Sequence, residues 1–255
     1  MKKIHIALLL AFALVFILGC QLVTGAPSTE PVEPVSVPNE PATNEEPAAA
    51  PTQAPTLAPQ PTTPPAAASQ SGDLIFQTDF PNIDDWEVIA KNQDGYNVQL
   101  RGNGLYVEVP KDFDFWYAYA PIMSYEDVRI EADVQLVGGT NYTYITLTCR
   151  SSEAGEYVFF MDTGGYWQIG KYVFGDNSTY ERLAEGGSNK IKVAKNPNHI
   201  AAVCKGTKLT MYINGSEVGS VEDAHLSSGI VGVGVETFDY PLAQVMFHNL
   251  EVYIP

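Results

Sequence analysis

The sequence predicts an all-β fold, an antiparallel β-sandwich, preceded by a signal peptide and a disordered Pro-rich linker. Several segments, such as Val128 to Leu136, alternate apolar and polar residues with a period of two, as half-buried strands do. Turn signals separate these segments, above all Asn214-Gly215, because a type I′ hairpin needs positive φ at both positions. No long segment has the period of an amphipathic helix, so little helix is expected.

The first twenty residues are typical of an export signal. A short basic start precedes an apolar run from Ile4 to Leu18. The run is too short to span a bilayer, which takes about 20 residues, and suits a signal-peptide core. It ends in Leu18-Gly19-Cys20, which resembles the lipobox of bacterial lipoproteins. That resemblance implies that residues 1–19 are removed and Cys20 is acylated. An uncleaved anchor with an incidental cysteine is the alternative.

Residues 20–72 are expected to form a tether. Between Ala26 and Gly72 the chain holds twelve of the 18 prolines, no aromatic residue, and neither Lys nor Arg. Such a composition cannot bury enough apolar surface to offset the entropy of ordering. We therefore expect an extended, disordered spacer that holds the next domain away from the membrane, outside the cell or in the periplasm.

Residues 73–255 are expected to form the folded domain. The formal charge of the chain is −16, which argues against a nucleic-acid binder, because such a protein needs basic clusters. Segments around Leu74 and Leu105 should be strands that lie beside the last one. The other expected strands are 128–136, 144–150, 157–162, 166–173, 190–194, 200–205, 208–213, 217–222, 230–235 and 244–254.

Two cysteines remain besides Cys20. Cys149 and Cys204 both lie at inward positions near strand ends, and in an exported protein such a pair is expected to form a disulfide. On the chain-entropy model the bond would contribute about 4 kcal/mol. Two free buried thiols are the alternative. A metal site built on Cys and His is not expected, since no further cysteine is present and the histidines are scattered.

Turn, cysteine and core residues over nearly the whole domain carry a family resemblance. They are Thr78-Asp79-Phe80, Trp86, Cys149-Arg150, 157–160, 165–169, 198–200, 204–206, Leu209, 212–215, 229–232 and 245–250. With them the domain resembles the concanavalin A-like lectin/glucanase superfamily, in particular its laminin-G-like and 3-keto-disaccharide-hydrolase-related jelly rolls. This resemblance implies a jelly roll but not one activity, because the superfamily includes binders, glycosidases, lyases and adhesion modules.

The resemblance also bears on metal binding and catalysis. Relatives often have Phe-Asp-Asn where this chain has Phe247-His248-Asn249, and in some branches a carboxylate there helps to bind calcium. Histidine is not a hard oxygen ligand, so the sequence disfavours calcium, and no other cofactor is expected. Glucanases of the superfamily carry Glu-x-Asp-x-Glu on one strand. Here Glu131 and Asp133 match, but Gln135 stands third and cannot act as a general acid.

A second carboxylate from elsewhere would therefore be needed for hydrolysis, and a solvated polar strand face is the plainer interpretation of Glu131 and Asp133.

Aromatic residues are the stronger clue, because 14 Tyr and 3 Trp exceed what a sandwich core needs. Sugar rings stack on such side chains while neighbouring polar groups bind the hydroxyls. Alternatively, the aromatics cover the edges of the core. Arg150 should pair with Glu131 or Asp133, or else bind ligand.

The predicted ligand-binding residues are Glu131, Asp133, Tyr142, Tyr144, Arg150, Trp167 and Tyr172. We expect a surface lipoprotein that displays a non-catalytic, carbohydrate-binding domain. Its expected partners are a polysaccharide or glycan and, through the lipid anchor, the membrane. A glycoside hydrolase or lyase is one alternative, and an adhesion or structural module that binds protein or the cell envelope is another.

Overall fold

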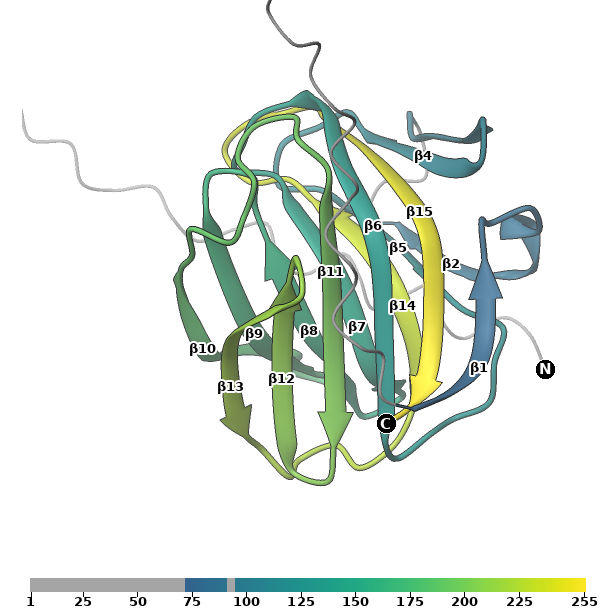
Figure 1. The fold of residues 1–255 in the computed structure, drawn as a ribbon, viewed down its shortest axis with the longest axis vertical. Helices are drawn as coiled ribbons and strands as arrows, with labels where there is room; N and C mark the ends of the chain where they lie inside the picture. The colour runs from purple at the N-terminus through teal and green to yellow at the C-terminus, as the bar shows by residue number, and fades with distance from the viewer. Residues whose placement is uncertain (1–71, 91–94) are drawn as a thin grey trace, which may run out of the picture. The chain divides into compact units, whose positions relative to one another are not determined.

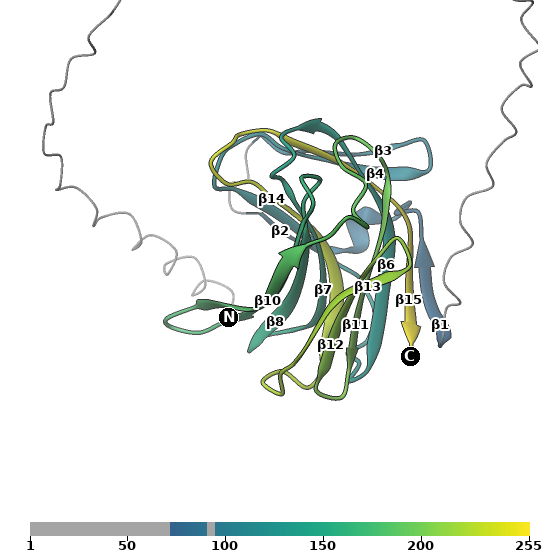
Figure 2. The same ribbon diagram turned by 60° about the vertical axis from the view of Figure 1, so that its left-hand side comes forward.

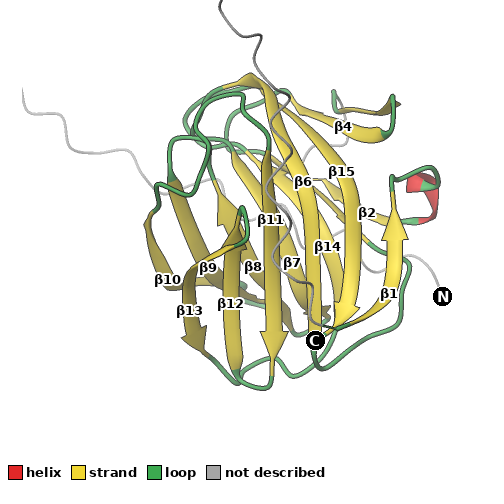
Figure 3. Ribbon diagram, viewed as in Figure 1, coloured by secondary structure: helices red, strands yellow, loops and turns green. Residues whose placement is uncertain are grey.

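The computed structural model describes residues 72–90 and 95–255. The predicted signal peptide, Cys20 and nearly all of the predicted linker lie outside the described residues. Two antiparallel sheets face each other, which confirms the predicted β-sandwich (Figures 1 and 3). The helical structure of the described part is one 3₁₀ turn, Ile83–Asp85. No helix in that part has the length and apolar character needed to cross a membrane.

Sheet A has eight strands in the order β13-β12-β11-β6-β15-β4-β3, with β1 paired to β15. The long β15 pairs with β6 along one side and with both β4 and β1 along the other. The expectation that the first strands lie beside the last is thus confirmed. The strands are β1 (Asp73–Thr78), β3 (Asn97–Arg101), β4 (Gly104–Val109), β6 (Val128–Gly139), β11 (Asn198–Lys205), β12 (Lys208–Ile213), β13 (Ser216–Glu222) and β15 (Ala243–Ile254).

Sheet B has seven strands in the order β10-β9-β8-β7-β14-β5-β2. Figure 2 shows this sheet curving around its outer face, the face turned away from sheet A. Its strands are β2 (Glu87–Ala90), β5 (Phe115–Tyr119), β7 (Tyr144–Ser152), β8 (Gly155–Met161), β9 (Tyr166–Val173), β10 (Thr179–Gly187) and β14 (Ile230–Glu236).

The core lies between the sheets and follows the predicted alternation. Ile130 in β6 and Val233 in β14 are fully buried, as are most of their inward neighbours, and each such side chain stabilises the fold by roughly 1.5–3 kcal/mol. Cys149 of β7 and Cys204 of β11 form a disulfide that joins the two sheets, as predicted. Asn214 and Gly215, with φ of 50° and 77°, close the β12–β13 hairpin, also as predicted.

The predicted strand at 190–194 is wrong. Its apolar alternation does not bury one face, since Ile191 is buried but Val193 is 53% exposed, and local partners take its backbone donors. The amide of Lys190 bonds to the Ser188 hydroxyl, that of Lys192 bonds to the Asn198 side chain, and Ala194 has a φ of 61°. Short polar side chains that bond nearby backbone compete in this way with a sheet ladder.

The sequence did not predict four of the strands, β2, β3, β5 and β10. Two of them, β10 and β5, show the reason. In β10 a register shift between Arg182 and Ala184 breaks the alternation on which the sequence argument rests. In β5 the run from Phe115 to Tyr119 is aromatic on its outer face and holds Trp116 on its inner face. Such a run shows no period of two.

Candidate functional site

The middle of the outer face of sheet B is nearly as buried as the core. Thr146 and Thr148 of β7 point outward by strand alternation, yet both are 0% exposed. Phe160 and Glu156 of β8 and Tyr117 of β5 lie on the same face and are also buried. Because these residues point away from sheet A, their burial means that neighbouring side chains cover the middle of this face.

Glycines allow the tyrosines on this face to lie flat. A Cβ added at Gly234 of β14 would stand 2.5 Å from the Tyr117 ring, and one at Gly232 would stand 2.8 Å from the Tyr119 ring. A Cβ atom does not come this close to a non-bonded carbon atom, so any side chain at these two positions would displace a ring. The two glycines therefore fix where Tyr117 and Tyr119 lie on the sheet.

Two buried carboxyl groups accept hydrogen bonds from these two tyrosines. The Tyr119 hydroxyl donates to Glu156 over 2.9 Å, and the Tyr117 hydroxyl donates to Glu236. Burial raises the pKa of each carboxyl to about 7, although the tyrosine hydrogen bonds partly oppose it, and the charge of Glu156 adds to the effect on Glu236. Both acids are at most 7% exposed, so this acid cluster is closed to a ligand in the described conformation.

Beside the acid cluster, sheet B carries an open depression of about 500 Å³. Tyr142 and Tyr240 stack at its rim with centroids 5.8 Å apart, and they are 60% and 54% exposed. Tyr144 stacks on Tyr166 at 6.0 Å and meets the edge of Phe238 at 4.8 Å. We call these five rings the loop platform. Two carboxylates, Asp162 and Asp239, complete the lining.

Local turns hold the loop platform in place. The Asp162 carboxylate accepts the amides of Gly164 and Tyr166, each at 2.9 Å, and so closes the turn between β8 and β9. Burial raises the pKa of Asp162, although these amides oppose the shift. The Tyr166 hydroxyl donates to Glu185 of β10. The platform therefore presents flat rings with carboxylate acceptors beside them, a combination that suits a polyhydroxylated ligand.

The structure divides the predicted ligand-binding residues between several places. Tyr142 and Tyr144 belong to the loop platform, and Tyr172 lies on the same face at the other end of β9. Trp167 points into the core, and its ring packs where a Cβ on Gly219 of β13 would stand 2.0 Å away.

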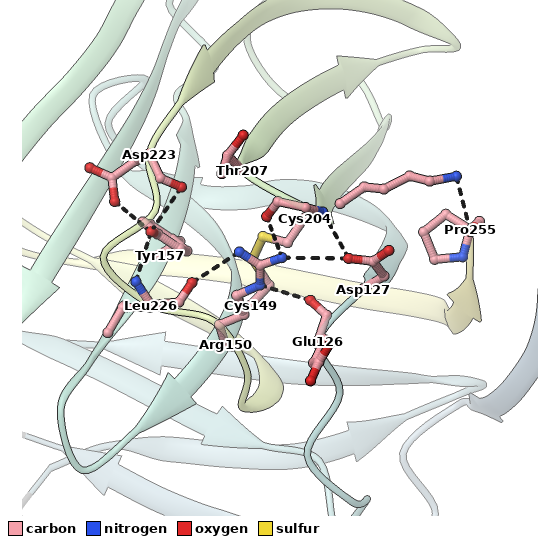
Figure 4. Close-up of polar contacts among 12 residues, drawn as sticks. Glu126, Asp127, Cys149, Arg150, Tyr157, Cys204, Thr207, Asp223, Leu226 and Pro255 are labelled. Atoms are coloured by element: carbon pink, nitrogen blue, oxygen red, sulfur yellow. Dashed lines mark hydrogen bonds and ion pairs between the residues drawn. A yellow bond between two sulfur atoms is a disulfide. The ribbon is translucent and has the colours of Figure 1, made fainter.

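Arg150 binds backbone at the disulfide end of the sandwich. Its guanidinium donates to the carbonyls of Glu126, Leu226 and Gly206 at 2.7–2.9 Å, and it lies 3.6 Å from Asp127 (Figure 4). Within the part of the chain that the structure describes, these are its partners in place of Glu131 or Asp133. Three carbonyl contacts from one buried cation tie together the loops that flank the disulfide.

Glu131 and Asp133 lie on the outer face of sheet A, remote in the fold from the loop platform. Arg129 binds Glu131, and His199 Nδ1 lies 2.9 Å from Asp133 Oδ1. Asn249 donates to Asp133 over 2.7 Å. Hydrogen bonds to both carboxylates raise the pKa of His199 to about 9, so it is a cation at neutral pH. These carboxylates are held in a charge network.

No three His, Cys, Asp or Glu side chains within residues 72–90 and 95–255 are grouped so as to hold a metal ion. His248 Nδ1 lies 3.1 Å from the carbonyl of Asn103. That calcium does not bind at His248 stays a prediction. A depression of about 450 Å³ nearby, lined in part by Asp79 and Asn103, has no aromatic lining.

Sequence reasoning did not single out Glu156, Glu236, Tyr166, Phe238 or Tyr240. A signal for the first two exists in Gly232-Val233-Gly234, because alternating glycines in a strand mark a close approach of other groups. Recognising which rings fill that space requires the β5–β14 pairing, which the sequence analysis did not contain because it missed β5.

No protein-family model matches the chain, and neither does any curated protein sequence. Its fold is similar to that of a Bacillus subtilis protein of unknown function with a galectin-like fold, at 11% identity and a TM-score of 0.58 over 72% of this chain and 97% of that one. The carbohydrate-binding module CBM66 from Bacillus subtilis is 18% identical with a TM-score of 0.51, over 65% of this chain and 94% of the module.

A glycoside hydrolase family 16 endo-glucanase from Bacteroides ovatus, solved in complex with G4G3G-2F-DNP, is 9% identical with a TM-score of 0.52, over 69% and 99% of the two chains. At such identities the likeness concerns the fold. It confirms the concanavalin A-like jelly roll that the sequence predicts.

Proposed function

We propose that the domain binds a carbohydrate chain at the loop platform. The observation that carries this proposal is the exposed, stacked pair Tyr142 and Tyr240 beside Asp239, in an open depression of about 500 Å³. Flat rings take the apolar faces of sugars, and a carboxylate accepts hydrogen bonds from their hydroxyl groups. Exposed aromatic groups of this kind mark binding sites on soluble domains.

The similar structures support the proposal. One neighbour is described as a carbohydrate-binding module, and another is a glycoside hydrolase solved with an oligosaccharide. Fold alone does not fix function, so the argument rests on the residues of this chain.

Binding without catalysis is our preferred form of the proposal. Glu131 and Asp133 are engaged by Arg129 and His199, and the acid pair Glu156 and Glu236 is closed to a ligand. A general acid must reach the bond that it protonates. Cleavage of a glycan by a glycoside hydrolase or a lyase, as the family resemblance allows, is the alternative function.

We further propose that the protein is displayed on a membrane through an acylated Cys20 and the linker 20–72. The lipobox-like sequence and the Pro-rich composition support this proposal. In a bacterial host, the chain should appear in the membrane fraction with acyl groups detectable by mass spectrometry. A Cys20→Ala variant that remains equally lipid-anchored would contradict it.

A glycan array with the full chain in detergent tests the binding proposal. Saturable binding should be lost in Tyr142→Ala and Tyr240→Ala but kept in Tyr212→Ala, a matched tyrosine on the outer face of sheet A. Circular dichroism should show that all three variants fold. A blank array at high protein concentration would refute carbohydrate binding, and release of reducing sugar would favour the hydrolase.

A further inference from the structure

A second group of aromatic rings lies at the other end of β9 and β10. Tyr172 and Tyr180 meet with ring centroids 4.9 Å apart, and Phe174 stacks beside Tyr172 at 6.5 Å with 20° between the planes. Tyr180 is 39% exposed and Phe174 is 40% exposed. We call these three rings the β9–β10 platform.

This platform is fixed by the strands beneath it. A Cβ on Gly170 of β9 would lie 2.2 Å from the Tyr180 hydroxyl, so the ring lies directly over the glycine. A Cβ on Gly155 of β8 would lie 2.1 Å from the carbonyl of Tyr172. Gly170 thus leaves the space that the Tyr180 ring occupies, and Gly155 allows β8 to approach the backbone of Tyr172 closely.

Ring contacts join the β9–β10 platform to the loop platform. Tyr144 of the loop platform contacts Phe160 at 5.0 Å, and Phe160 contacts Tyr180 at 6.2 Å. Tyr166 and Tyr172 stand on the same face of β9, six positions apart. At roughly 3.3 Å per residue Tyr166 and Tyr172 lie about 20 Å apart, so the two platforms together extend over the length of a short oligosaccharide and not of one sugar ring.

The most exposed apolar side chains of the two platforms are all aromatic. Within the described residues, exposed large aromatic side chains occur on the outer side of sheet B. Phe113 is counted with them because its backbone amide donates to the carbonyl of Phe238. They are Phe113, Tyr142, Phe174, Tyr180, Phe238 and Tyr240. The exposed aliphatic side chains of the same part of the chain lie on β1, β2 and β3 and at Met123, Val193 and Leu242, and Leu242 is two residues away from Tyr240. A protein interface mixes both kinds, whereas sugar rings stack on flat aromatic surfaces.

Charges along the two platforms disfavour an anionic ligand. Arg182 of β10 lies 2.9 Å from Glu185, which also accepts the Tyr166 hydroxyl. Asp162 and Asp239 add carboxylates at the loop platform. A uronic-acid or sulfated chain laid across both platforms would therefore face more negative than positive groups.

We propose that the β9–β10 platform is a second subsite, so that the domain holds the interior of an extended, uncharged polysaccharide across both aromatic platforms. A single sugar or a chain end would occupy only the loop platform. This inference rests on the proposed carbohydrate-binding function and deepens it.

Calorimetry on the full chain tests the inference with cello-, laminari-, manno- and xylo-oligosaccharides, each from the monosaccharide to the hexasaccharide. In the series that binds, affinity should rise by about tenfold with length and then level off once both platforms are spanned. Phe174→Ala should remove that gain and leave the affinity for the shortest binding oligosaccharide unchanged. Because Phe174 is a partly exposed residue outside the core, this variant should fold, and Tyr212→Ala serves as the matched control.

Affinity that does not depend on length, or oligogalacturonate bound more tightly than every neutral series, would overturn the second subsite while carbohydrate binding stands. Failure of every oligosaccharide and of the glycan array would overturn the proposed function, and the second subsite with it.

Discussion

The outer face of each sheet carries a buried glutamate, and the pKa values of the two glutamates are shifted in opposite directions. On sheet A, burial alone would raise the pKa of Glu131, but contacts with His199 and Arg129 hold it below its usual value. On sheet B, burial raises the pKa of Glu156 to about 7, and its hydrogen-bond partner is the neutral Tyr119. Burial acts in the same direction on both faces, so the nearby cations decide the outcome.

This difference indicates which of the two outer faces can bind a ligand. A carboxylate neutralised by fixed cations, as on sheet A, contributes to stability and offers little to a ligand. Sheet B has instead a closed floor of tyrosines and buried acids whose pKa is raised, with open rings at its ends. The exposed rings are free to contact a ligand because the floor beneath them is already filled.

The largest expected effect comes from breaking the floor of sheet B. Gly234→Val should lower the free energy of unfolding by about 3 kcal/mol, since its Cβ would stand 2.5 Å from the Tyr117 ring. Urea denaturation measures this loss. Gly187→Val is the control, because a Cβ there meets nothing closer than 3.8 Å. Equal midpoints for the two variants would mean that the floor tolerates the added side chain.

Replacing Glu156 on sheet B and Glu131 on sheet A by glutamine tests whether the two pKa shifts act on stability in opposite directions. The folded pKa of Glu156 lies above its unfolded value, so its stabilisation is full below about 4.5 and is lost as pH rises through 7. Glu156→Gln should therefore stabilise the protein at pH 8, by on the order of 2 kcal/mol. Thermal denaturation at pH 5 and pH 8 measures the change.

Glu131→Gln should do the reverse. The lowered pKa of Glu131 means that its contribution is present above about 4.5 and is lost as pH falls through the folded pKa. The amide should thus destabilise at pH 7 and 8, by on the order of 1–2 kcal/mol, and have less effect in acid. The same pH dependence in both amide variants would refute the contrast between the sheets.

The sequence predicted what depends on local pattern. The sandwich, the Asn214-Gly215 hairpin and the Cys149–Cys204 disulfide follow from alternation, turn chemistry and cysteine placement. It did not reveal that Glu156 accepts a hydrogen bond from Tyr119, because they come from β8 and β5, and the second of these strands has no alternation to recognise. The partners of a polar strand face depend on pairing across the sheet, which a single strand's pattern does not contain.

A smaller effect is expected within the network of sheet A. Asp133 is the first cause of the raised pKa of His199, about 9. Asp133→Asn should lower that pKa by about one unit, because one carboxylate is lost while Glu131 remains. Titration of the His199 ring by NMR measures it, with His225 as the internal reference. A His199 pKa that stays at about 9 would mean that Glu131 alone sets it.

The smallest effect on stability should come from the loop platform. Tyr240 is 54% exposed and stacks chiefly on Tyr142, so Tyr240→Ala should change the free energy of unfolding by about 0.5 kcal/mol or less. Binding of the array-positive glycan should nonetheless fall by about tenfold or more, because the ring offers the surface on which a sugar stacks. Denaturation and calorimetry on one preparation separate the two quantities. A variant that loses stability and affinity together would place Tyr240 in the scaffold, whereas a loss of affinity alone makes its exposed ring part of the binding surface.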